Sequence, residues 1–414
     1  MRIRRWWVVL ALTACTTSGP GRSPVPDRVA GWRADVDALL DARDTVHPNG
    51  WHGQSRAAWL AAAAQVKARV GSLTDDQALV EVVRLAAMPS WSGRDGHSGL
   101  FPFTGDRHAL PVRWWQFPEG LVITAARPPY GALVGAHVEA VAGRPVAEVL
   151  RLVEPLAPRD NASNLLAYAP LYLRSPELLG GLGVTRGTGP VTLTVVGQDG
   201  MHKNVDVAPV AAAVDNDWSG GQPQLLPPGA ADWLRRQAEP MWWTYLAGSR
   251  TLYVQLNQVR SGTEDIVAAV LARARHGGVD RVVLDLRHNG GGDNTTLGPL
   301  EAALSDPAID RPGRLFVLIG RCTFSAAANL ATDLERTSAV FAGEALGGSP
   351  NLYGDATEIP LPWGDLTLQM ATRYWERSGA KDPRVTIEPD LAVPLTAGEY
   401  LAGRDPVLAA VLQR

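Results

Sequence analysis

The chain has 414 residues, of which 46% are apolar and 20% are charged. This length suffices for two or three domains with buried cores, and this composition excludes a wholly disordered chain. The formal net charge is only −3, which gives no reason to expect a nucleic-acid partner.

The N-terminus has the features of a secretion signal. Residues 1–5 contain three arginines, and an apolar run over residues 6–14 is too short to span a bilayer. Small residues before Cys15 resemble the lipobox of bacterial lipoproteins. We therefore expect removal of residues 1–14, a lipid on Cys15, a tether over residues 15–29, and an extracytoplasmic protein anchored to the bacterial cell membrane. An ordinary signal peptide cut nearby is the alternative.

Residues 30–108 are predicted to form a helical lobe. Apolar residues recur at helical spacing from Trp32 to Leu40. Ser55 can cap a second helix, and Thr74 begins a capping box for a third. The lobe ends in a glycine-rich loop that contains His97.

Residues 109–212 are predicted to form a small β-rich module with a helical insert. Apolar patterns predict strands over residues 138–141 and 191–196, and Asp199-Gly200 predicts a hairpin turn after the second strand. Residues 213–239 are rich in proline, glycine and polar residues, which is typical of a linker or a long loop.

Strand and helix patterns alternate over residues 240–414, which favours an α/β core with a partly parallel sheet. The expected strands cover residues 252–256, 282–286, 315–319 and 366–370, and the expected helices cover residues 263–274 and 326–334. This core contains the two segments that could carry chemistry.

The first segment is a glycine loop. Three glycines, residues 290–292, follow the buried strand that contains Asp285. Glycine lets the backbone approach a ligand closely, and its amides can stabilise a developing negative charge. The carboxyl end of a strand is where α/β folds place their sites. A plain flexible turn is the alternative.

The second segment contains Ser325, where a helix is expected to begin. The positive end of the helix dipole favours an oxyanion there, and the amide of Ala326 can donate to it. Alternatively, Ser325 or Thr323 simply caps the helix. Cys322 is the only cysteine besides Cys15, so an internal disulfide and a cysteine-rich metal site are excluded; Cys322 is either a reactive neighbour or a packing residue.

A serine nucleophile needs a base. The chain has only three lysines, Lys67, Lys203 and Lys381, and none lies in a buried run, which disfavours a lysine base. Histidine is the natural alternative. His288 adjoins the glycine loop, whereas the residues alone do not single out His97 among the eight histidines.

Several motifs together resemble the serine peptidases that include the tail-specific (C-terminal processing) proteases and tricorn protease. The motifs are Asp-Gly-His at residues 95–97, Asp-Leu-Arg-His-Asn-Gly-Gly-Gly at 285–292, Thr-Phe-Ser-Ala at 323–326, Gly-Glu-Ala-Leu-Gly-Gly at 343–348 and Pro-Asp at 389–390. Their order and spacing carry the resemblance, which covers roughly residues 90–400.

The resemblance implies a ClpP/crotonase-like core with a helical N-terminal lobe and a PDZ-like module, the last of these suggested by residues 138–146. It also implies that Ser325 is the nucleophile. The amides of Ala326 and Gly291 would then form the oxyanion hole.

The sequence departs from the tail-specific branch because Ser349 stands where that branch has its catalytic lysine. The tricorn-like branch uses a histidine base, which favours His97 over His288. In that branch a serine precedes the histidine, whereas this chain has Gly96. A late glutamate supports the catalytic group there, and Glu388 is its counterpart by position.

The sequence therefore predicts a serine peptidase that acts on peptide or protein substrates through an acyl-enzyme, without a metal or organic cofactor. Two alternatives stay open. One is a non-catalytic binding protein for apolar ligands or peptides, as in the retinoid-binding repeats that resemble this family; the other is an esterase or amidase. The oligomeric state is open. Five tryptophans either line an apolar cleft or pack in the core: Trp114, Trp115, Trp242, Trp243 and Trp375.

Overall fold

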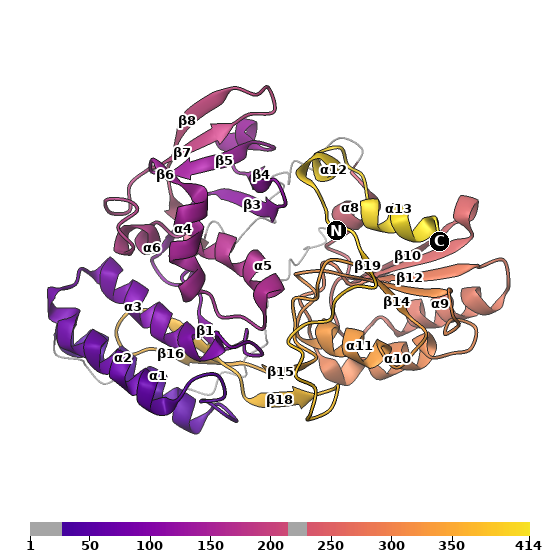
Figure 1. Cartoon of the computed structure of the whole chain (residues 1–414), viewed down its shortest axis with the longest axis horizontal. Coiled ribbons are helices and arrows are strands. Elements are labelled where there is room, and N and C mark those ends of the chain that lie inside the picture. Colours follow the sequence, from indigo (N-terminus) through magenta and orange to yellow (C-terminus); the bar gives the residue numbers. More distant parts are fainter. Residues whose placement is uncertain (1–26, 214–229) are drawn as a thin grey trace, which may run out of the picture.

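The computed structural model describes residues 27–213 and 230–414. Figure 1 shows a helical lobe, a β-rich module and an α/β core. The predicted signal peptide, Cys15 and most of the predicted tether and linker lie outside the described residues. Within the two described ranges, no helix has both the length and the apolar character that crossing a membrane requires.

The N-terminal lobe is helical, as predicted. Its helices are α1 (Arg28–Thr45), α2 (Arg56–Arg69) and α3 (Asp75–Ala87). The side chain of Ser55 caps α2, and Thr74 and Gln77 form a capping box at the start of α3. The lobe and the β-rich module share one continuous hydrophobic core, so neither is an independent folding unit in this structure.

The β-rich module is a six-stranded antiparallel sheet with the order β3-β4-β5-β7-β8, and β6 pairs with β5. Its strands are β3 (Val112–Phe117), β4 (Gly120–Ala126), β5 (His137–Val141), β6 (Arg144–Pro145), β7 (Val191–Val196) and β8 (His202–Val207). Its helices are α4 (Val146–Val153), α5 (Ala162–Tyr172) and α6 (Pro176–Gly181), and β2 (His108–Ala109) pairs with β9 (Val210–Ala211). The predicted strands over 138–141 and 191–196 and the hairpin turn are confirmed. Strand β3 is the edge of this sheet.

The core is a second six-stranded sheet with the order β10-β11-β12-β13-β14-β19. Its elements are α8 (Asp232–Arg235), β10 (Met241–Leu246), β11 (Thr251–Leu256), α9 (Glu264–Arg275), β12 (Arg281–Asp285), α10 (Gly298–Leu304), β13 (Leu315–Ile319), α11 (Ala326–Leu334), β14 (Val340–Gly343), β19 (Leu391–Ala392), α12 (Ala397–Leu401) and α13 (Pro406–Leu412). All neighbours except β10 and β11 are parallel.

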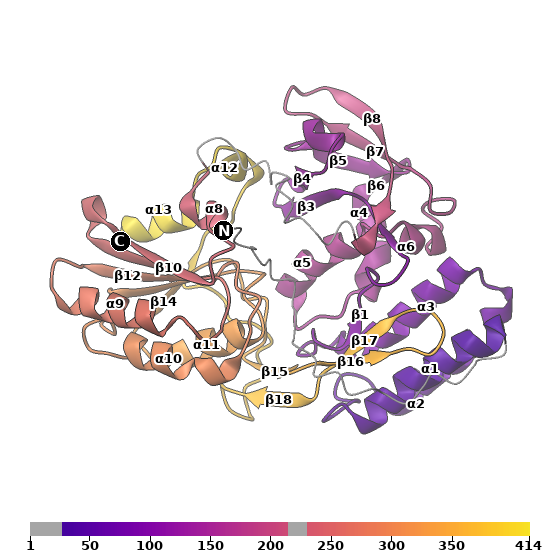
Figure 2. The same cartoon turned by 180° about the vertical axis from the view of Figure 1, so that it is seen from behind.

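Helices cover both faces of this sheet, because its strands carry apolar side chains on each face. Helices α9, α10 and α11 pack on one face, and α8 and α13 pack on the other; Figure 2 shows this arrangement from behind. The carboxyl ends of β12, β13 and β14 lie side by side. The loops that follow these strands therefore meet at one edge of the sheet.

The chain leaves the core after β14 and returns to the helical lobe. The strands of this excursion are β15 (Asn351–Gly354), β16 (Thr357–Pro360), β17 (Thr367–Met370) and β18 (Arg373–Glu376). Strand β17 pairs with β1 (Gly99–Leu100), which directly follows the histidine loop, and β15 pairs with β18 in the ribbon between the two parts in Figure 1. The excursion thus ties the loop of His97 to the core.

Candidate active site

The glycine loop and the segment of Ser325 meet at the sheet edge. A Cβ atom added to Gly291, which has a φ of +110°, would lie only 2.6 Å from Ser325 Cβ. The amide of Phe324 donates to the carbonyl of Asn289 at 3.0 Å. The loop after β12 and the start of α11 are thus joined by a backbone hydrogen bond, and only a glycine fits between them.

Ser325 has a strained backbone. Its φ of 54° and ψ of −125° lie in a region that a residue with a side chain rarely occupies, at a cost of about 1–3 kcal/mol. The chain passes from β13 to α11 through residues 320–325, and Ser325 is the last residue before the helix. The Ser325 side chain makes no capping hydrogen bond to α11. The hydroxyl is therefore not used to cap the helix.

The turn before Ser325 is held by Thr323. The Thr323 hydroxyl donates to the carbonyl of Leu286 at 2.9 Å and accepts from the amide of Gly320 at 3.0 Å. Burial raises the pKa of the nearby Cys322 thiol to about 11, which keeps this thiol protonated at neutral pH.

The two predicted oxyanion donors differ in whether their amides already donate a hydrogen bond. In the described part of the chain, no acceptor lies within hydrogen-bonding geometry of the Ala326 amide, which stands at the N-terminus of α11. The Gly291 amide donates to Asn289 Oδ1 at 2.9 Å. Ala326 is thus free to donate to an oxyanion, whereas Gly291 has to share or release its bond to Asn289.

His97 lies against the nucleophile segment. Its ring stacks on the ring of Phe324, the residue before Ser325, with a centroid separation of 4.4 Å and an interplanar angle of 19°. Burial lowers the pKa of His97 to about 4, although the carboxylates of Asp95 and Asp355 oppose this effect. The imidazole is therefore neutral at pH 7 and can accept a proton. Within the described residues, no hydrogen bond joins His97 to Ser325; such bonds often tighten only when substrate binds.

His288 lies on the other face of the core sheet. Its ring stacks on Trp233 of α8 at 4.8 Å, and its Nε2 lies 3.3 Å from the side-chain nitrogen of Gln237. Burial lowers the pKa of His288 to about 4 as well. The pKa therefore does not separate the two histidines, but the ring contacts do, because the His97 ring stacks on Phe324, next to Ser325, whereas the His288 ring stacks on Trp233.

Glu388, the predicted supporting acid, is exposed. It follows the buried residue Ile387, whose carbonyl accepts from the amide of Leu346 at 3.0 Å. Among the described residues, Glu388 has no hydrogen bond or ion pair with His97 or Ser325. The carboxylates whose charge acts on His97 are those of Asp95 and Asp355.

Asp160, which the sequence did not single out, joins the two loops of the site. Its fully buried carboxylate accepts from the Gly96 amide at 2.6 Å and from the Ser349 amide at 2.9 Å. Burial raises the pKa of Asp160 to about 7 in spite of these hydrogen bonds. The next residue, Asn161, donates from Nδ2 to the carbonyls of Leu346, Gly348 and Val385. One helix N-terminus thus holds the histidine loop and the loop after β14 together.

By the resemblance to tail-specific proteases, Ser349 stands where that branch has its lysine. It is fully buried, and its hydroxyl lies 2.8 Å from the carbonyl of Val385 and 3.1 Å from that of Asp160. The lysines lie elsewhere: Lys67 pairs with Asp37, and Lys203 pairs with Asp199. This position therefore braces the loop rather than supplying a base.

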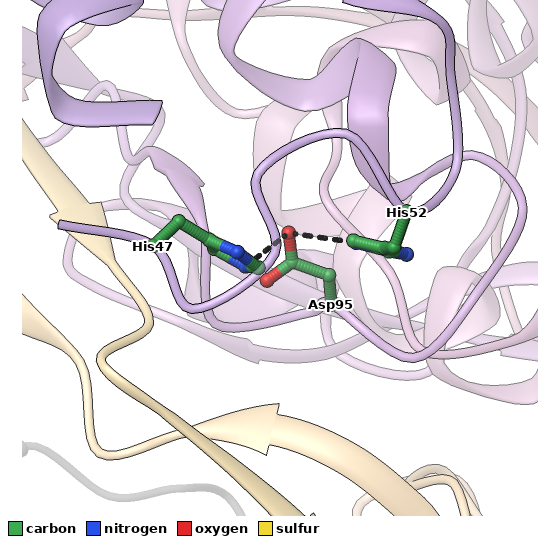
Figure 3. Close-up of side chains that lie close together, drawn as sticks. All are labelled: His47, His52 and Asp95. Atoms are coloured by element: carbon green, nitrogen blue, oxygen red, sulfur yellow. Dashed lines mark hydrogen bonds and ion pairs between the residues drawn. The ribbon is translucent and has the colours of Figure 1, made fainter. Parts of the chain in front are cut away.

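Asp95 lies two residues before His97, in a cluster with His47 and His52 (Figure 3). Its Oδ2 lies 3.3 Å from His47 Nε2 and 3.4 Å from His52 Nε2, and it accepts from Arg43 at 2.8 Å. Burial alone would raise the pKa of Asp95, but Arg43 and the two histidines outweigh it and hold the pKa well below its ordinary value.

This cluster does not fit a metal site. The Asn49 amide donates to His47 Nδ1 at 3.0 Å, which leaves the proton of a neutral ring on Nε2, the atom that would have to ligate the ion. The guanidinium of Arg43 also stands where a cation would be repelled. The cluster is better described as a buried polar network that anchors the histidine loop.

The resemblance to tail-specific proteases implies a helical N-terminal lobe, a β-rich module and an α/β core in which Ser325 lies close to Gly291. The structure has this arrangement. A mutant of CPAF superposes with a TM-score of 0.65 at 12% identity, over 93% of this chain and 96% of that chain. Mature CPAF complexed with lactacystin gives 0.64 at 14% identity, over 93% and 97%.

CPAF belongs to the tail-specific protease family, so the resemblance predicted from the sequence is confirmed at the level of the fold. The photosystem II D1 C-terminal processing protease aligns with 91% of this chain and 98% of its own length at 15% identity, with a TM-score of 0.41. No family model matches the chain, and no curated protein matches its sequence.

Proposed function

We propose that this chain is a serine peptidase in which Ser325 is the nucleophile and His97 is the base. The observation that carries the proposal is the strained serine at the start of α11, whose hydroxyl caps no helix and whose Cβ lies close to Gly291. The stacking of the His97 ring on Phe324 supports the choice of base.

The proposed reaction has two halves. His97 takes the proton of the Ser325 hydroxyl as the oxygen attacks the peptide carbonyl, and it then returns that proton to the departing amine. Water, activated by the same imidazole, hydrolyses the acyl-enzyme. The Ala326 amide and a second amide of the glycine loop, that of Gly291, stabilise the oxyanion; each such donor contributes about 3 kcal/mol to transition-state stabilisation.

The finer fold assignment is also a proposal. The parallel strands β11 to β14, with a glycine loop and a helix N-terminus at their carboxyl ends, support a ClpP/crotonase-like core. The small antiparallel sheet with α4 following β6 supports a PDZ-like module.

A Ser325→Ala variant tests the proposal. The purified wild-type chain should hydrolyse peptides and react covalently with a fluorophosphonate probe, and Ser325→Ala should do neither. Ser305→Ala, at the exposed end of α10, is the matched control and should label like the wild type. Labelling that survives in Ser325→Ala would exclude this nucleophile. Matched peptide and ester substrates then separate a peptidase from an esterase.

We further propose that the protein is anchored outside the cytoplasm through a lipid on Cys15. Support comes from the sequence of residues 1–15, which lie outside the described part of the chain. A Cys15→Ala variant should move from the membrane fraction to the soluble fraction of the producing bacterium, with no incorporation of a labelled fatty acid. Unchanged membrane association would contradict the anchor.

A further inference from the structure

A cavity of about 240 Å³ lies between the β-rich module and the core. The edge strand β3, the carboxyl ends of β13 and β14 and the segment after β19 form its walls. Its apolar lining includes Trp115, Phe117, Ile319, Leu395 and Tyr400. An apolar cavity of roughly 150 Å³ is enough to hold a benzene molecule, so this cavity can hold an aromatic or large aliphatic side chain.

The loops that carry Gly291 and Ser325 also contribute residues to the lining of the cavity. Arg287 and Arg321 line the cavity, and they stand four residues before Gly291 and Ser325, respectively. Four residues of chain span at most about 14 Å even when fully extended. Since an extended peptide advances about 3.3 Å per residue, about four residues of a peptide bound at Ser325 would span the same distance.

Two arginines of the lining, Arg287 and Arg321, already pair with carboxylates, so they do not select a charged ligand. Arg321 pairs with both oxygens of Glu344, donates to the carbonyl of Gln116 at 2.7 Å and lies over the Trp115 ring at 4.6 Å. Arg287 pairs with Asp285 and Asp405. Beside these ion pairs, the lining offers a ligand apolar surface and the indole N–H groups of Trp115 and Trp233, which have no hydrogen-bond partner among the described residues.

We infer that this cavity is a specificity subsite that accepts a large apolar side chain of the substrate peptide. The inference rests on the proposed function and names the class of substrate for it. Of the five tryptophans considered in the sequence analysis, Trp114 and Trp115 line this cavity. Trp242 is buried in the core. A peptide with a bulky apolar residue at one fixed distance from the scissile bond gains contact area that a small or charged residue lacks.

Cleavage of a defined peptide library by the full chain, with products read by mass spectrometry, tests this subsite. The filling variant is Thr124→Trp, because Thr124 is a half-buried residue of β4 that lines the cavity. The matched control is Thr194→Trp, a half-buried threonine of β7 in the same sheet that does not line it. Leu395→Ala enlarges the cavity and serves as a second variant that does not depend on fitting a larger side chain.

The wild type should show one position enriched in large apolar residues within about four residues of the cut. Thr124→Trp should lower kcat/KM at least tenfold for such peptides but not for peptides with alanine there, and Thr194→Trp should behave like the wild type. Leu395→Ala should shift the preference toward naphthylalanine over leucine.

The subsite is wrong if the wild type cleaves with no apolar preference at any fixed position, or if the preference persists in Thr124→Trp and Leu395→Ala. Fluorophosphonate labelling of Ser325 separates this failure from failure of the proposed function. A chain that labels but shows no preference refutes only the subsite. A folded chain that neither labels nor cleaves refutes the peptidase, and the subsite with it.

Discussion

The nucleophile segment and the histidine loop are held in place by different means. Ser325 is positioned by backbone contacts between neighbouring strand ends, such as the hydrogen bond from the Phe324 amide to the Asn289 carbonyl. His97 is positioned by buried side chains from distant parts of the chain, chiefly Asp160, which accepts from the Gly96 amide, and Arg43, which donates to Asp95. One half of the site thus follows from a single sheet, and the other requires that the lobe, the module and the core all fold.

The largest expected effect comes from replacing each of the two histidines near the site in turn. Loss of a general base costs about 10²–10⁴-fold in rate, so we expect His97→Ala to lower the rate of fluorophosphonate labelling by that factor. His288→Phe keeps the stacking on Trp233 and should label at the wild-type rate. Rapid labelling of His97→Ala together with slow labelling of His288→Phe would reverse the assignment.

The next prediction concerns the backbone half of the site. In Gly291→Ala the new Cβ would meet Ser325 Cβ at 2.6 Å, on a residue whose φ is +110°. We expect kcat to fall by about 10²–10³-fold, as for loss of an oxyanion donor, while the far-ultraviolet circular dichroism spectrum is kept. Gly290→Ala is the matched control, because a Cβ there has nothing within 4 Å. Equal losses in the two variants would contradict this close approach.

Much of the nucleophile half could be predicted from the sequence. The helix over residues 326–334 has the predicted bounds, and the strands before both loops lie where apolar runs indicated them. Local signals suffice there, since a buried strand, three glycines and a small-residue helix start are contiguous in the chain. The hydrogen bond from the Gly291 amide to Asn289 Oδ1 could not be predicted, because it depends on the rotamer of the Asn289 side chain.

The histidine half could not be predicted from local signals. Asp160 contacts Gly96 across 64 positions and Ser349 across 189 positions. A buried aspartate at the start of a helix has the same sequence signature as an ordinary exposed cap. Of the strands β15 to β18, only the one over residues 366–370 was predicted from the sequence. The others are too short to give a clear apolar pattern. Only the family resemblance selected His97.

Two arginine–aspartate pairs that end on α1 measure how much the buried network stabilises the fold. Asp95→Asn leaves Arg43 as an uncompensated buried charge, and we expect the free energy of unfolding to fall by about 3–5 kcal/mol. Asp44→Asn breaks the solvent-exposed pair with Arg56, which should cost less than about 1 kcal/mol. Urea denaturation followed by circular dichroism measures both. Similar losses would mean that the cluster in Figure 3 does not anchor the histidine loop.

The smallest effects concern pH. A general base works only when it is neutral, so labelling should be lost as the pH falls through the pKa of His97 in the folded state. That pKa is lowered to about 4, so half of the rate should remain near pH 4, whereas an ordinary histidine would have lost half near pH 6.5. Asp355→Asn removes a carboxylate that raises this pKa and should move the acid limb to lower pH.

Asp160 offers a competing explanation that the same profile can separate. Its pKa is raised to about 7, so it takes up a proton as the pH falls below neutrality, and the acceptor of the Ser349 amide is then weakened. A loss of labelling near pH 7 that disappears in Asp160→Asn would therefore come from loosening of the loop junction. A limb near pH 4 that is unchanged in Asp160→Asn but shifts in Asp355→Asn belongs to His97. The pH profile thus shows whether protonation of the His97 imidazole or protonation of Asp160 limits the reaction at acid pH.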